Sequence, residues 1–338
     1  MACVALADAD GDRSEPENMD MRILMIGLGD IARKAYLPVL SRRGDLDIHL
    51  TTRNKVVLDE VGREFRIVNR HTSVADALSA TSFDAAFVHA ATPAHGELVR
   101  LLIDRGIPTF VDKPLADTLS EVEGLVTLAA ARATPLFLGF NRRFAPDYVA
   151  LRAVDANLIV MEKHRHRQPD RPRRVVFDDF IHVVDTLLSL APAPVRRRTI
   201  ETHVVDDMLH SITLTLAGDG FTAIGMMHRN SGLDEERLDV IGGGMRHSVR
   251  DLAERVEARG TQCMQRRADW ISVGRQRGFE AMCDDFLIAV RERRPIDATA
   301  ILPTHAICEA IVRHAETSIR GELPAGADYR DGDKQQRI

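Results

Sequence analysis

Three side chains in this sequence are suited to proton transfer: Lys113, Asp178 and His182. Lys113 follows an apolar run, where partial desolvation and a nearby cofactor could lower its pKa toward working pH. Asp178 and Asp185 lie four residues before and three residues after His182, so on a helix all three share one face. One carboxylate could then orient the imidazole while the ring exchanges a proton with a substrate. Each candidate also has an interpretation without a catalytic role. Lys113 could be a solvent-facing lysine at the end of a strand. The aspartate could cap the start of a helix, with His182 packed against its neighbours.

A glycine-rich turn, GLGDIA at residues 27–32, follows one expected strand and opens an expected helix. In that context Gly27 permits the tight turn and Gly29 lets the backbone approach a pyrophosphate. The helix N-terminus adds amide donors and positive partial charge. The turn therefore predicts dinucleotide binding, with Asp30 and Ile31 also beside the cofactor.

The end of the second expected strand reads Thr51-Thr52-Arg53-Asn54. Nicotinamide dinucleotide sites commonly carry an acid here for the adenosine ribose, and this sequence has none. A guanidinium at the same place suits the extra phosphate of NADP. Thr52 and Arg53 thus favour NADP over NAD, although a surface arginine in a loop would give the same sequence.

The elements that must position these residues alternate in type. From Met21, short apolar runs such as RILMIGL and FDAAFVHA alternate with amphipathic segments such as HGELVRLLIDRG, which predicts a doubly wound parallel sheet, α/β in class. From about Asn141 the pattern becomes that of antiparallel strands, followed by helices. We expect a flexible extension at 1–20, a Rossmann domain at 21–140, a substrate-binding and oligomerisation domain at 141–325 and a polar tail at 326–338.

Further polar residues follow the strands at the edge where doubly wound sheets bind ligands. Thr92, Pro93 and His95 come just after FVHA. His95 either touches ligand or only starts a helix. Asn141 and Arg142, after the strand PLFLGF, are candidates for the cleft between the domains.

Three motifs, VDKPLA, GFNRRFAP and DDFIHVVDT, stand in this order behind the glycine turn. With LGDIARKAYLPVL and MEKHR, they resemble the Gfo/Idh/MocA oxidoreductase family, and its MviM-like branch in particular, from Met21 to about Ser318. The resemblance implies a second α/β domain with a large, mostly antiparallel open sheet. Helices would cover one face of that sheet, and often a partner subunit the other, giving a homodimer or homotetramer.

The resemblance also implies site roles and an activity. The family's EKP-type motif corresponds to Asp112-Lys113-Pro114, with Asp in place of Glu, and its DxxxH element to Asp178 and His182. Thr92 and Pro93 would lie against the cofactor, and Asp112, Lys113 and Pro114 are further candidates for cofactor binding. Lys113, Asp178 and His182 become catalytic candidates; the candidates for substrate contact are Lys113, Asn141, Arg142, Asp178, His182 and Asp185.

The implied reaction is hydride transfer between NAD(P) and a carbinol or carbonyl of a sugar, polyol or related small molecule. Where many members have a glycine-rich approach to DxxxH, this chain has Arg173-Arg174-Val175-Val176-Phe177, so sugar specificity does not carry over. Two alternatives remain: a nonredox dinucleotide-binding regulator, and an NAD-assisted lyase or hydrolase.

Composition narrows the partners. A net charge of −5 over 338 residues, with no sustained basic tail, argues against nucleic acid. The arginines between 165 and 174 have no interleaved aromatics and suit a solvated loop, although His164, Arg165, His166 and Arg167 could recognise an acidic substrate. Four widely spaced cysteines suit reduced thiols in the cytoplasm and no structural metal. No apolar run is long enough to cross a membrane.

Overall fold

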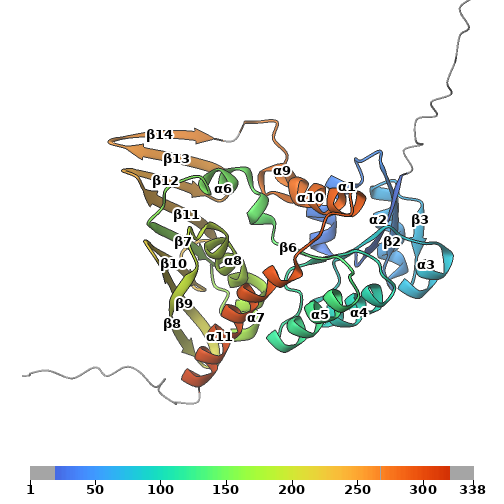
Figure 1. Ribbon diagram of the computed structural model, residues 1–338, viewed down its shortest axis with the longest axis horizontal. Coiled ribbons are helices and arrows are strands. Elements are labelled where there is room, and N and C mark those ends of the chain that lie inside the picture. The colour runs from blue at the N-terminus through green and yellow to red at the C-terminus, as the bar shows by residue number, and fades with distance from the viewer. Residues whose placement is uncertain (1–19, 267, 320–338) are drawn as a thin grey trace, which may run out of the picture.

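The computed structural model describes residues 20–266 and 268–319, and places two β-sheets side by side with helices between and around them (Figure 1). The predicted tail at 326–338 lies outside the described residues, as does the predicted extension at 1–20 except for Asp20. Both sheets confirm the predicted fold class: one is parallel and the other mostly antiparallel.

The first sheet has the order β3-β2-β1-β4-β5-β6, and all its strands are parallel. Because the chain starts at β1, runs outward to β3 and returns beside β1 with β4, the order reverses at β1, where doubly wound sheets bind ligands. The strands are β1 (Met21–Ile26), β2 (Leu46–Thr51), β3 (Asn69–His71), β4 (Ala85–Val88), β5 (Thr109–Asp112) and β6 (Leu136–Gly139).

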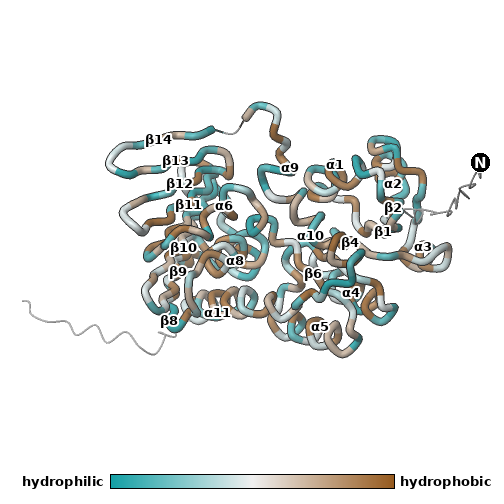
Figure 2. Tube along the Cα trace, turned by 45° about the horizontal axis from the view of Figure 1, so that its top comes forward, coloured by the Kyte–Doolittle hydropathy of each residue, from teal (hydrophilic) through white to brown (hydrophobic). Residues whose placement is uncertain are grey.

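Helices connect these strands and cover both faces of the sheet (Figure 1). Local sequence explains where two of them begin: the side chain of Asn54 accepts from the amides of Val56 and Val57, and that of Ser73 from Asp76. Strands β4 and β6 are mostly hydrophobic (Figure 2), as strands buried on both faces must be. The helices are η1 (Ala32–Tyr36), α1 (Leu37–Leu40), α2 (Lys55–Glu64), α3 (Val74–Ala80), η2 (Thr92–Ala94), α4 (His95–Asp104) and α5 (Leu119–Ala131).

The second sheet has the order β14-β13-β12-β11-β7-β10-β9-β8, and only the β7–β10 pair is parallel. Along β7, β10 and β11, buried residues alternate with partly exposed ones, so one face is covered. The strands are β7 (Leu158–His164), β8 (Val195–Val205), β9 (Met208–Gly218), β10 (Phe221–His228), β11 (Glu235–Gly242), β12 (Met245–Arg250), β13 (Glu254–Arg259) and β14 (Thr261–Arg266).

Helices α8 and α11 cover the inner face of this sheet. A Cβ at Gly225 of β10 would lie 2.6 Å from Val183 and 3.0 Å from Leu187, so α8 packs directly on the strand. The remaining helices are η3 (Asn141–Phe144), α6 (Pro146–Leu151), α7 (Pro172–Val175), η4 (Val176–Phe180), α8 (Ile181–Leu190), α9 (Val273–Gln276), α10 (Phe279–Arg291), η5 (Ala298–Ile301) and α11 (Leu302–Ile319).

Helix α10 returns from the second sheet to the first. Its Phe279 packs edge-on against Tyr36, and its Phe286 packs against Phe87 and Phe110. Residues near 280 therefore share the hydrophobic core of β1, β4 and β5. The division into 21–140 and 141–325 stays a prediction, and this helix ties the two parts together.

Candidate active site

The glycine turn after β1 is closely surrounded on one side and open on the other. Gly27 has φ +88°, and a Cβ there would lie 2.5 Å from the amide nitrogen of Ala90. Only glycine fits both the conformation and this close approach. A Cβ at Gly29 would meet no atom within 4 Å, so the backbone at Gly29 faces open space.

That open space is part of a cavity of about 460 Å³ at the carboxyl edge of the first sheet. Four residues predicted to bind cofactor line it: Gly27, Gly29, Thr52 and Arg53. The sequence interpretation missed others that line it, among them Thr72, Ser73, His89, Ala90 and Ala91. The position of Thr72 and Ser73 just after β3 was the available signal, because parallel strands end at one edge.

Other predicted cofactor residues lie around this cavity without lining it. The side chain of Asp30 is 86% exposed and pairs with Lys34 one helical turn later. Ile31 is 38% exposed. Thr92 and Pro93 begin the short helix η2, and only its last residue, Ala94, reaches the cavity wall.

His95 is buried and holds two loops together. Its Nδ1 lies 2.8 Å from the carbonyl oxygen of Pro114, and its Nε2 lies 2.8 Å from that of Ala90. Both ring nitrogens thus face backbone within the protein. His95 thereby fixes the Lys113-Pro114 segment, which contains a cis peptide bond, relative to the loop after β4.

Asp112 is also held from inside the protein. The hydroxyl of Tyr36 donates to its Oδ1 at 2.7 Å, and burial raises the pKa of Asp112 above its ordinary value. The Tyr36 ring packs against His89, with ring centroids 4.0 Å apart. This arrangement fixes the end of β5, from which Lys113 extends.

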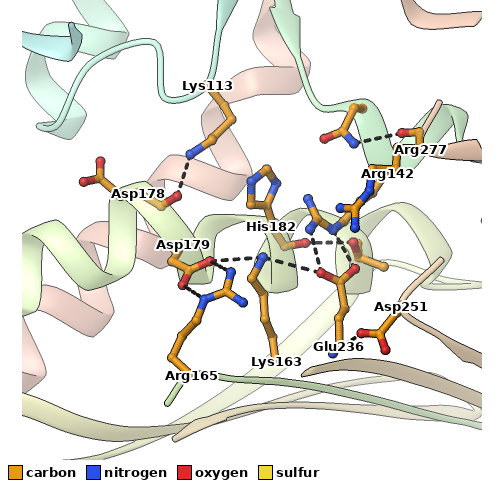
Figure 3. Close-up of polar contacts among 12 residues, drawn as sticks. Lys113, Arg142, Lys163, Arg165, Asp178, Asp179, His182, Glu236, Asp251 and Arg277 are labelled. Carbon is orange, nitrogen blue, oxygen red and sulfur yellow. Dashed lines mark hydrogen bonds and ion pairs between the residues drawn. The ribbon is translucent and has the colours of Figure 1, made fainter. Parts of the chain in front are cut away.

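Lys113 reaches across to the second part of the chain. Its Nζ donates to the backbone carbonyl of Asp178 in the π-helical turn η4, which leads into α8 (Figure 3). Residues 65 positions apart in the sequence are thus in contact. This contact brings Lys113 to the beginning of the helix that carries His182.

His182 lies among cations rather than carboxylates. Burial, followed by the charges of Arg142, Lys113 and Lys163, holds the pKa of His182 well below its ordinary value, so the ring is neutral. The ring has no hydrogen-bond partner within residues 20–266 and 268–319. The Asp178 carboxylate points away from it (Figure 3) and lies 3.6 Å from Arg174.

Asp185 and the predicted cleft residues have other partners. Asp185 is buried and receives hydrogen bonds from Arg143, at 2.6 and 3.0 Å, and from Thr304 at 3.4 Å. The side-chain amide of Asn141 donates to the carbonyl of Arg277 at 2.8 Å. The structure therefore brings Lys113, His182 and Arg142 together, while Asp185 and Asn141 hold the surrounding elements in place.

A buried ionic network below His182 was missed by the sequence interpretation (Figure 3). Arg142 donates to both oxygens of Glu236, at 2.8 and 2.6 Å. Lys163 contacts Glu236 at 3.4 Å and Asp179 at 3.0 Å, and Arg165 binds both oxygens of Asp179. The alternation in LIVMEKH could have revealed Lys163, because it places a lysine on the same face as Ile159 and Met161.

A doubly wound parallel sheet with a cavity at its carboxyl edge, and acid–base side chains nearby, is the arrangement expected of a nucleotide-dependent oxidoreductase. Residues 21–140 match the model of the oxidoreductase family with an NAD-binding Rossmann fold, and residues 146–260 match the YceM-like C-terminal domain. The chain belongs to the Gfo/Idh/MocA oxidoreductase family, which confirms the resemblance seen in the sequence.

Individual relatives agree with this assignment. The chain is 34% identical to the putative oxidoreductase YceM of Salmonella typhimurium, over 81% of this chain and 90% of that protein. A family oxidoreductase from Vibrio cholerae superimposes with a TM-score of 0.84 at 31% identity, over 89% of this chain and 99% of that one. The dehydrogenase MviM from Clostridium difficile superimposes with a TM-score of 0.82 at 29% sequence identity, over 87% of this chain and 99% of that one.

These findings establish an NAD(P)-dependent dehydrogenase that acts on alcohol or carbonyl groups. In the part of the chain that the structure describes, no group of three or more His, Cys, Asp or Glu side chains could hold a metal ion. None of the described helices is both long and apolar enough to span a bilayer.

Proposed function

We propose that this protein transfers hydride between NADP and a carbinol or carbonyl of a sugar, polyol or related small molecule, with His182 exchanging the proton and Lys113 stabilising charge on the reacting oxygen. The observation that carries the proposal is the hydrogen bond from Lys113 to the backbone of Asp178. It supports a single site at which the end of β5 and the start of α8 meet, beside the carboxyl edge of the first sheet.

The chain's own residues supply binding and proton transfer. The bound nicotinamide supplies the hydride acceptor or donor. The neutral ring of His182 accepts the hydroxyl proton of the carbinol, and the Lys113 ammonium stabilises negative charge on that oxygen. Asp178 acts through its backbone carbonyl, which orients the ammonium. In the reverse direction the protonated ring returns the proton to the carbonyl oxygen.

The preference for NADP is supported by Arg53. Its side chain is exposed at the rim of the cavity, and it has no ion pair with any described residue. Thr52, Thr72 and Ser73 line the same cavity as Arg53, and Glu97 is the one carboxylate among the residues that line it. A free guanidinium among hydroxyl groups suits a phosphate better than an unmodified ribose.

We also propose a homodimer or homotetramer formed through the outer face of the second sheet, and a cytoplasmic location. Leu158, Val160, Ile224 and Met226 alternate with the residues under α8, so they lie on the opposite, partly exposed face. Adjacent apolar side chains on β7 and β10 suit a protein partner. The described cysteines are free thiols, which suits a reducing compartment.

Relatives suggest the first substrates to test. The myo-inositol dehydrogenase Hyg17 of Streptomyces leeuwenhoekii is 49% identical over 76 residues, or 22% of this chain. An inositol 2-dehydrogenase of Agrobacterium fabrum is 28% identical over 187 residues. Polyols therefore head the panel, followed by hydroxy acids and sugars.

The direct test is reduction of NADP or NAD, followed at 340 nm, with this panel. We expect turnover with at least one polyol, sugar or hydroxy acid, and Lys113→Ala should lower kcat/KM about 10²- to 10⁴-fold while leaving dinucleotide binding intact. Arg132→Ala is the control, because that arginine is exposed and pairs with Asp104, away from the glycine turn.

Two outcomes separate the alternatives. Turnover without net change in a bound cofactor would identify an NAD-assisted lyase or hydrolase. Unchanged activity in Lys113→Ala, or dinucleotide binding without any turnover, would instead favour a nonredox regulator.

A further inference from the structure

The network below His182 contains more buried positive charge than negative charge. Four cations, from Arg142, Lys163, Arg165 and Arg229, share only the carboxylates of Asp179 and Glu236. Three of the four side chains are less than 10% exposed. Buried charge without a counterion is costly, so an excess of two cations indicates a position that a negative ligand completes.

The excess is concentrated around Asp179. Lys163 approaches its Oδ1 at 3.0 Å, and Arg229 donates to its Oδ2 at 2.6 Å. Arg165 donates to both oxygens, at 2.7 and 2.8 Å. One carboxylate therefore faces three cations, and we call Lys163, Arg165 and Arg229 the basic subsite.

Other nearby acids offset the charge of the basic subsite only in part, although the charge of Asp234 acts on Arg165. Asp170 and Asp178 lie at the rim, each paired with the exposed Arg174 at 3.3 and 3.6 Å. Asp234 accepts the backbone amide of His166. Burial raises the pKa of Asp178 above its ordinary value, and the charges of Lys113 and Arg174 oppose that rise.

Two guanidinium groups retain free donors. Arg229 uses Nη1 for Asp179 and Nε for the carbonyl of Gln168, while Arg165 uses Nε and Nη2 for Asp179. Within the described ranges, the remaining terminal nitrogen of each has no partner. Both arginines line a cavity of about 490 Å³, together with Asp178 and Asp179.

The cavity is connected to the proposed reacting groups through Asp178, which lines it. Lys113 binds the backbone of Asp178, one residue before Asp179, and Lys163 and Arg165 both act electrostatically on His182. In Figure 3, the Lys113 ammonium lies to the upper left of the His182 ring and the Lys163 ammonium lies below it. A substrate whose reacting carbon lies at His182 would thus place a neighbouring substituent over the basic subsite.

We infer that the substrate carries an oxyanion substituent, a carboxylate or phosphate, which binds Arg165 and Arg229 beside His182. Two guanidinium groups that each retain one free terminal nitrogen favour such oxyanions through charge-assisted hydrogen bonds. This inference rests on the proposed dehydrogenase function and narrows its substrate class from neutral polyols to acidic ones.

The first test measures binding of malonate and of inorganic phosphate to the dinucleotide-loaded full chain by calorimetry. Arg165→Gln should weaken binding of the preferred probe about tenfold or more. Arg196→Gln is the matched control, because this arginine is exposed and pairs with Asp219 on the second sheet. Retained dinucleotide binding reports folding of each variant, and Arg229→Gln replaces any Arg165 variant that does not fold.

The second test compares turnover of glucose, glucuronate and glucose 6-phosphate, which share one ring and differ in charge. We expect the two anionic sugars to give higher kcat/KM than glucose, and their ratio tells carboxylate from phosphate. Equal probe affinity in the wild type and Arg165→Gln, or no binding by the wild type, would overturn the inference.

The two tests also separate this inference from the proposed function. Better turnover of neutral glucose would overturn the acidic substrate class while supporting a dehydrogenase. Probe binding that depends on Arg165, without hydride transfer to any substrate, would support the basic subsite and count against the dehydrogenase function.

Discussion

Glu236 provides the sharpest test of how the buried network is held together. Its carboxylate receives two hydrogen bonds from Arg142, one from Tyr148 at 3.1 Å and a contact from Lys163 at 3.4 Å. Glu236→Gln keeps the shape and one acceptor oxygen but removes the charge. Arg142 would then be buried without a carboxylate, whereas Lys163 would retain Asp179.

Breaking a buried ion pair from one side costs about 3–5 kcal/mol. For Glu236→Gln we expect a loss of free energy of unfolding near the lower limit, about 3 kcal/mol, because the amide oxygen still accepts one hydrogen bond. With roughly 2–4 °C per kcal/mol for chains of this order of size, the melting temperature should fall by about 6–12 °C.

The measurement is thermal unfolding followed by circular dichroism and calorimetry at pH 7. Glu235→Gln is the matched control: it makes the same chemical change one residue away, on the opposite face of β11, and should shift the melting temperature by less than about 2 °C. Equal shifts for the two variants would refute the claim that Glu236 compensates buried cations. The double variant Arg142→Met/Glu236→Met should be less destabilised than the sum of the two single Met variants.

Three further predictions concern the cofactor site and pH. Arg53→Ala should weaken the binding of NADP about five- to tenfold, measured by calorimetry, because the pair between Arg53 and the phosphate is exposed and screened. The affinity for NAD should not change. An equal loss of affinity for both dinucleotides would contradict the phosphate-binding role. Gly27→Ala should destabilise the fold, because its Cβ would collide with Ala90, whereas Gly29→Ala should keep the melting temperature and lose dinucleotide affinity. Burial lowers the pKa of His305 to about 4, so its neutral ring stabilises the fold above the unfolded pKa of about 6.5. That contribution is lost as pH falls from about 6.5 to 4. Over this range the melting temperature of His305→Gln should fall less steeply with pH than that of the wild type. The same dependence of melting temperature on pH in both proteins would disprove the prediction.

The sequence was informative wherever structure depends on residues close together in the chain. Period-two and period-3.6 patterns predicted the parallel and antiparallel sheets, because each pattern reflects which face of a local element is buried. Gly27 and Gly29 predicted the turn, since the required conformation and close approach belong to a few consecutive residues. Arg53 was located by its position after β2.

Only the tertiary structure decided which side chains meet. Spacing placed Asp178, His182 and Asp185 on one helical face, yet Asp185 binds Arg143 and no carboxylate reaches the His182 ring within the described chain. Likewise, Lys163 and Glu236 come from strands about 70 residues apart, and β-sheet register alone makes them neighbours.

The physical reason is that sequence periodicity specifies a face, whereas ion pairs depend on distances between elements distant in the chain. The sequence by itself determined the fold class, the glycine turn and the candidates Lys113 and His182. The tertiary structure determined that these two side chains lie over an excess of buried positive charge, contributed by β7 and by the segments that follow β7 and β10.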